Sequence, residues 1–86
     1  MAIIFKLTGP PAVAAITARE IKICNGSNIF TFDTIVYQPE TGALEVFVNG
    51  ALCYPELDYI ENGPQEITFH NGKVENGDII LVIARG

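Results

Sequence analysis

The sequence predicts an all-β fold, either a compact antiparallel β-sandwich or a partly open barrel, with about seven short strands and an extended N-terminal arm. Short apolar runs alternate with turn signals at regular spacing along most of the chain. The turn signals are Asn-Gly pairs at 25–26, 49–50, 62–63, 71–72 and 76–77. Asn-Gly tolerates the positive φ angles of a tight hairpin turn, so these pairs between apolar runs predict β-hairpins.

The N-terminal part, residues 1–24, is predicted as a strand followed by an arm, in one domain with the module at 25–86. Residues 2–8 alternate as a strand, and Gly9-Pro10-Pro11 ends it because proline cannot donate to a β-ladder. Residues 12–18 favour an extended arm, since they are few for a helix. The arm leads into a strand whose Ile21 and Ile23 lie on one face, with Glu20 and Lys22 on the other.

The module continues this pattern of alternation. Residues 29–37 are predicted as a strand with Phe30, Phe32 and Val36 pointing inward. Further inward positions are expected at Leu44, Val46, Val48, Ile67 and Phe69. The last strand, Ile79 to Arg85, is an unbroken apolar run. Such a strand is covered on both sides, so we expect one side to face the core and the other to meet a loop, a neighbouring subunit or a host surface.

Composition narrows the functional classes. The chain has 86 residues, 49% of them hydrophobic, and a domain this small buries only about 60% of its unfolded surface. We therefore expect another chain to cover part of the apolar surface. The net charge is −5 and the five basic residues are scattered, which argues against binding to nucleic acid or to an anionic membrane. Lys6 and the prolines interrupt the N-terminal apolar region, so we expect no export signal and no membrane helix.

Reactive side chains are sparse. His70 and Ser27 are the single histidine and serine, and nothing in their spacing indicates a nucleophile–base pair. His70 is interpreted as a surface histidine, and Cys24 and Cys53 as reduced, half-buried cysteines, with one disulfide as the alternative. A zinc site built on these three residues needs a fourth ligand, and the aspartates are dispersed. We predict no catalytic residue, no cofactor and no metal.

The tyrosines are the remaining candidates for recognition. Tyr37 and Tyr54 are predicted at strand ends or beside turns, where aromatic rings can stack on sugars or on a partner protein. Tyr59 is interpreted as a core residue whose hydroxyl finds a partner nearby.

Several segments, in order, resemble a β-module of tailed-bacteriophage virion proteins. They are Gly26-Ser27, the phenylalanine strand at 30–32, the VFVNG hairpin at 46–50, Asp58-Tyr59, the ITF strand at 67–69, and Gly77-Asp78 before the final aliphatic strand. The match spans about residues 25–85. The resemblance implies a non-enzymatic protein that assembles as a homo-oligomer, often a trimer.

The resemblance leads to a predicted function. We expect a structural protein of the virion, made in the bacterial host cytoplasm, that decorates or cements the capsid and binds the major capsid protein or fibre and tail subunits. A tail-fibre or host-receptor (glycan-binding) module is the alternative. The predicted partner-binding residues are Ile3, Ile4, Phe5, Pro10 and Pro11 in the arm, Ile79, Leu81 and Ile83 in the last strand, and Tyr37 and Tyr54 on loops.

Overall fold

The computed structural model describes residues 15–86. These residues form seven strands, which are β1 (Ile16–Ile23), β2 (Ile29–Thr31), β3 (Leu44–Val48), β4 (Ala51–Cys53), β5 (Tyr59–Gly63), β6 (Glu66–Phe69) and β7 (Ile79–Arg85). The predictions for the strand at 2–8 and for Ile3, Ile4, Phe5, Pro10 and Pro11 lie outside the described residues. The predicted arm is described only from residue 15, and strand β1 already begins at Ile16.

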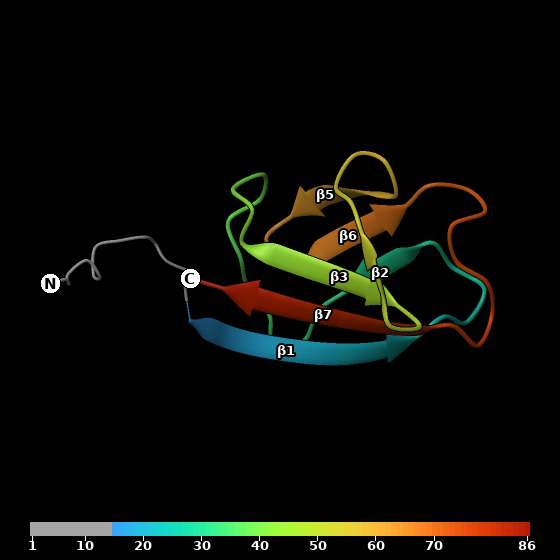
Figure 1. Cartoon of the computed structure of the whole chain (residues 1–86), viewed down its shortest axis with the longest axis horizontal. Helices are drawn as coiled ribbons and strands as arrows, with labels where there is room; N and C mark the ends of the chain where they lie inside the picture. Colours follow the sequence, from blue (N-terminus) through green and yellow to red (C-terminus); the bar gives the residue numbers. More distant parts are fainter. Residues whose placement is uncertain (1–14) are drawn as a thin grey trace, which may run out of the picture.

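The strands form two antiparallel sheets. One sheet has the order β1-β7-β3-β4 and the other has the order β2-β6-β5. Figure 1 shows β7 between β1 and β3. The last strand is therefore central in its sheet, as its apolar sequence suggests. The predicted all-β antiparallel fold is confirmed, in its open two-sheet form.

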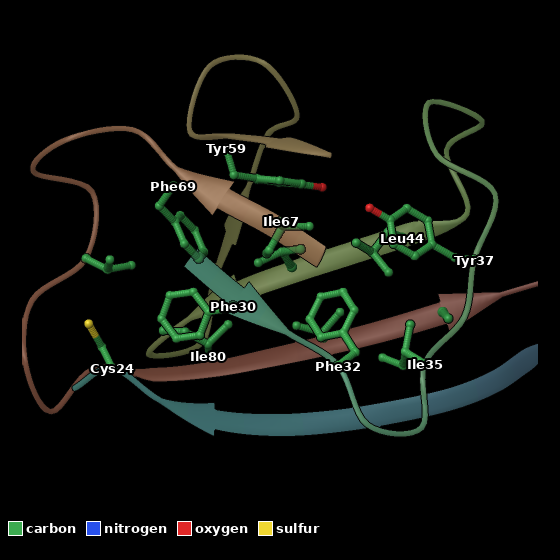
Figure 2. Close-up of a cluster of buried hydrophobic side chains, with 14 residues drawn as sticks. Cys24, Phe30, Phe32, Ile35, Tyr37, Leu44, Tyr59, Ile67, Phe69 and Ile80 are labelled. Carbon is green, nitrogen blue, oxygen red and sulfur yellow. The ribbon is translucent and has the colours of Figure 1, made fainter. Parts of the chain in front are cut away.

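Side chains from both sheets fill the space between them. Ile80 and Val82 of β7 and Ile67 of β6 are completely buried. Phe69 meets the ring of Phe30 edge-on, with 5.5 Å between ring centroids, and Figure 2 shows these rings beside Ile80 and Ile67. The inward positions predicted on β3 and β6 are confirmed, with Leu44, Val46, Ile67 and Phe69 buried and Val48 packed against the core.

The β3–β4 turn is the hairpin that the sequence predicts best. Asn49 and Gly50 have φ angles of 50° and 88°, which are the two positive values of a type I′ turn. Asn49 also ties the turn to β7, because its Nδ2 donates to Asp78 Oδ1 at 2.9 Å and its Oδ1 accepts from the Ile79 amide at 2.9 Å. The Asn-Gly pair thus fixes both the turn and its position on the neighbouring strand.

The prediction of a turn at Asn62-Gly63 is wrong. Strand β5 continues through Gly63, and the turn falls at Pro64 and Gln65. A register irregularity between Glu61 and Gly63 absorbs one residue, as a β-bulge does. Proline at the first turn position, with its φ already fixed, provides the reversal that the Asn-Gly pair was expected to provide.

The predicted strand at 29–37 is also too long. Strand β2 ends at Thr31, and Val36, expected inward, is 66% exposed, whereas Ile35 and Tyr37 are buried. The change of phase comes from contacts with residues that are distant in sequence. After Phe32 the chain leaves the ladder, and the amide of Tyr37 donates to the carbonyl of Pro64 at 2.9 Å.

Glu20 holds this connection from the inner side of β1. Its Oε1 accepts hydrogen bonds from the amides of Thr34 at 2.6 Å and Ile35 at 2.9 Å. Burial alone raises the pKa of Glu20, but the bonds from the backbone of Asp33, Ile35 and Thr34 outweigh it and lower the pKa from 4.5 to about 2. Lys22 Nζ lies 3.4 Å from Glu20 Oε2 and 3.2 Å from Asp33 Oδ2. Two charged side chains of β1, Glu20 and Lys22, therefore lie on the inner side of the four-stranded sheet.

Candidate protein-binding surface

The side of the four-stranded sheet that faces away from the core is apolar and open to solvent in the described part of the chain. We call this side the outer face. Because the side chains of a strand alternate between the two faces of its sheet, the buried residues Ile80, Val82 and Ala84 place the intervening residues of β7 outward. The outer face comprises Arg19, Ile21 and Ile23 of β1, Ile79, Leu81, Ile83 and Arg85 of β7, Glu45 and Phe47 of β3, and Leu52 of β4.

Strand register aligns the apolar residues in rows. Ile21 is paired with Leu81, Leu81 with Phe47, and Phe47 with Leu52. This row crosses all four strands of the sheet without a polar side chain. Directly paired residues have Cβ atoms about 5 Å apart, so the four side chains form one continuous ridge.

Several of these aliphatic side chains have large exposed fractions. Ile21 is 66% exposed, Ile23 65%, Ile79 50% and Leu52 47%. Together these fractions correspond to about two fully exposed aliphatic side chains, and burying that much surface is worth roughly 3–6 kcal/mol. A contiguous apolar patch of this kind makes the outer face the candidate contact surface of the chain.

Charged groups lie at one end of the outer face. In the next row Arg19 is paired with Ile83, and Ile83 with Glu45. Arg85 Nε lies 3.1 Å from Glu45 Oε1. The outer face therefore has an uncharged centre and an edge that carries both signs of charge, the arrangement of an interface core with a polar rim.

The predicted partner-binding residues have different positions. Ile79, Leu81 and Ile83 lie together on the outer face. Tyr54 is 57% exposed in the β4–β5 connection, near Leu57 in sequence, which is 71% exposed. The expectation that Tyr37 is available to a partner is wrong, because it is 6% exposed and its hydroxyl donates to the Glu66 carbonyl at 3.3 Å. Burial raises the pKa of this hydroxyl.

Four apolar residues of the outer face, Ile21, Ile23, Phe47 and Leu52, were not predicted from the sequence as partner-binding residues. Alternation placed Ile21 and Ile23 on the same face of β1, but which face points to solvent depends on the pairing of β1 with β7. Phe47 and Leu52 become part of the ridge only through the registers of β3 with β7 and with β4. The one signal in the sequence for these residues was the last strand, whose side chains are apolar on both sides. Its second apolar side indicates that the neighbouring strands also carry apolar side chains on that face.

A hollow of about 380 Å³ lies on another part of the surface, lined by Glu40, Gly42, Pro55, Glu56 and Glu61. Glu40 and Glu56 have positive φ angles of 62° and 74°. Its lining is acidic and contains no aromatic ring, so it lacks the stacking platform of the predicted glycan site.

His70 and Ser27 form hydrogen bonds within the local structure. The ring Nε2 of His70 lies 2.8 Å from the Glu56 carbonyl oxygen, and Ser27 Oγ accepts from the amide of Ile29 at 3.0 Å. His70 is therefore a hydrogen-bonded surface residue, as predicted. Cys24 and Cys53 are both free thiols, one buried and one half-buried, and burial raises the pKa of the Cys53 thiol.

Two kinds of feature are absent from residues 15–86. No group of three or more histidine, cysteine or acidic side chains is arranged to hold a metal ion. This part of the chain also has no helix that is long and apolar enough to span a membrane. Comparison of the sequence and structure with protein-family models, curated proteins and solved structures found no match.

Proposed function

We propose that this chain is a non-enzymatic structural subunit that binds other protein chains through the outer face. The observation that carries the proposal is the ridge of Ile21, Leu81, Phe47 and Leu52, with Ile23 and Ile79 beside it. The free energy available from covering the exposed aliphatic side chains of the outer face is a large fraction of the stability of a small domain, which is about 5–15 kcal/mol.

We further propose that the assembly is the virion of a tailed bacteriophage, where the chain decorates or cements the capsid. The resemblance of residues 25–85 to virion β-modules supports this part of the proposal. The partners are then the major capsid protein or fibre and tail subunits, and the protein is made in the host cytoplasm before it joins the particle.

The alternative is a fibre or receptor-binding module. The exposed side chains of Tyr54 and Leu57 favour it, because exposed aromatic and aliphatic residues on one loop can contact a sugar or a host protein. This alternative predicts saturable binding of the purified chain to host cell-surface glycans. A glycan array without signal counts against it.

Incorporation into particles tests the main proposal. Variants Leu81→Lys, in the ridge, and Thr31→Lys, at the exposed end of β2 in the other sheet, add the same charge at different surfaces. We expect wild type and Thr31→Lys to be found by mass spectrometry in gradient-purified particles, and Leu81→Lys to be lost from them. Thermal melting checks that both variants fold.

Two results contradict the proposal. Wild-type protein that is absent from purified particles rejects the virion assignment. Leu81→Lys protein that incorporates at the wild-type level rejects the outer face as the contact surface. A chain lacking residues 1–11 tests the predicted docking arm in the same assay, and we expect it to fold and to fail to incorporate.

A further inference from the structure

The four-stranded sheet has protected edges and an unprotected face. Edge strand β1 points Glu20 and Lys22 inward and has a register irregularity between Ile16 and Ala18. The opposite edge strand, β4, has three residues. Inward charges, bulges and short strands are the devices by which proteins block strand addition at a sheet edge. A partner of this sheet is therefore expected on its outer face.

The pattern on the outer face is complementary to itself. The residues of β7 lie in the middle of each row, with β1 residues on one side and β3 residues on the other. Consider a two-fold axis that runs along β7, between two sheets packed face to face. This rotation places β7 against its own copy, Ile21 against Phe47 of the second copy, and Arg19 against Glu45 of the second copy.

The charges favour this arrangement. Arg19 and Glu45 are at the same distance from β7 on opposite sides, within one row, so the two-fold rotation brings opposite charges together twice. Aligned sheets pack at an angle of about 30°, and the long side chains of arginine and glutamate can absorb the resulting offset. The rows of Ile79 and Leu81 are uncharged, whereas Arg85, at the end of β7, comes near its own copy at the axis. Its pairing with Glu45 at 3.1 Å offsets this repulsion, and the chain as a whole has a net charge of −5.

We propose that the outer face binds a second copy of this chain, in a two-fold symmetric dimer with β7 on the axis. This inference rests on the proposed function, and it identifies one partner of the outer face as a second copy of the chain. With β7 on the axis, β1, β7 and β3 overlap with the second copy and the edge strand β4 does not. Three strands and an eight-residue β1, at about 3.3 Å per residue and about 4.8 Å between strands, give an overlap of roughly 380 Å². Two copies bury about 760 Å², the size of a weak and transient interface, so the dimer dissociates on dilution.

Sedimentation velocity over a concentration series provides the test. We expect wild type to shift from monomer to dimer as its concentration rises. Arg19→Glu and Glu45→Arg each place like charges at both symmetric contacts, and each raises the dissociation constant by roughly tenfold. A one-to-one mixture of the two variants restores association, because both contacts of the heterodimer then join an acidic side chain to a basic one. Glu75→Arg, in the β6–β7 connection, is the charge control and leaves association unchanged.

Three outcomes contradict the dimer. A chain that stays monomeric at all concentrations, a closed trimer, or a mixture that associates no better than the single variants contradicts the two-fold arrangement. If the chain is monomeric but Leu81→Lys is still lost from particles, the dimer is wrong and the proposed function stands. If the dimer forms but the chain is absent from particles, the virion assignment is wrong and the dimer stands.

Discussion

Replacing Glu20 with glutamine tests how the sandwich holds its β2–β3 connection. The Glu20 carboxylate accepts bonds from the amides of Thr34 and Ile35, and its side chain is 10% exposed. The difference between 4.5 and about 2 in its pKa corresponds to about 3 kcal/mol, at roughly 1.4 kcal/mol per pKa unit. Glutamine keeps an acceptor oxygen but loses the charge, so we expect Glu20→Gln to lower the free energy of unfolding by about 2 kcal/mol at pH 7.

The pH dependence follows from the direction of the shift. A carboxylate with a depressed pKa in the folded state stabilises fully above the unfolded value of 4.5, and its contribution is lost as the pH falls through about 2. Glutamine does not titrate. The contribution of the carboxylate falls by about 2 kcal/mol between pH 7 and pH 3, so the stability gap between wild type and Glu20→Gln should be largest at pH 5–7 and close to zero near pH 3.

Urea unfolding followed by circular dichroism at pH 7, 5 and 3 measures this gap. At pH 7 the melting temperature of Glu20→Gln should be lower by about 10 °C. Glu75→Gln, at an exposed glutamate in the β6–β7 connection, is the matched control and should stay within about 0.5 kcal/mol of wild type. A gap that is absent at pH 7, or that does not shrink in acid, refutes the assigned role of Glu20.

Two other pairs of variants test the core and the hairpin turn. Among the described residues the buried Tyr59 hydroxyl has no hydrogen-bond partner, so Tyr59→Phe should raise the free energy of unfolding by about 1 kcal/mol, whereas Tyr37→Phe, which removes a bonded hydroxyl, should lower it by about 1 kcal/mol. Equal effects of the two changes in urea unfolding contradict this interpretation. Asn49→Ala removes a left-handed turn residue and two bonds to the start of β7 and should cost about 2 kcal/mol, while Asn76→Ala, in a loop without these bonds, should cost less than about 1 kcal/mol. Similar losses in thermal melts of both asparagine variants reject the special role of Asn49.

The sequence predicted those parts of the fold that depend on local chemistry. Alternation identified the inward residues of β3 and β6, and Asn49-Gly50 predicted its hairpin, because the two positive φ angles are a property of that dipeptide. The turn predicted at Asn62-Gly63 did not form, because a β-bulge extends β5 through Gly63 and Pro64 reverses the chain one residue later. Val36 was misplaced because Glu20, distant in sequence, draws the chain out of the ladder at Thr34 and Ile35.

The candidate surface was only partly predictable, because it too depends on contacts between residues that are distant in sequence. The two-sided apolar character of the last strand indicated that its outer side meets another surface, and Ile79, Leu81 and Ile83 do lie on the outer face. Ile21 and Phe47 join them through strand pairing, which a single sequence does not specify. The failure at Tyr37 has a similar origin, because its burial depends on bonds to Pro64 and Glu66 in the other sheet.

The contact surface can be tested by hydroxyl-radical footprinting of the free chain and of the assembled chain. Side-chain oxidation is measured at Ile21, Leu81 and Phe47 of the ridge, with Tyr54 and Leu57 in the β4–β5 connection as reporters elsewhere on the surface. We expect strong protection of the ridge on assembly and little change at Tyr54 and Leu57. Unchanged oxidation of the ridge, with protection at Tyr54 and Leu57 instead, contradicts the outer face as the contact surface.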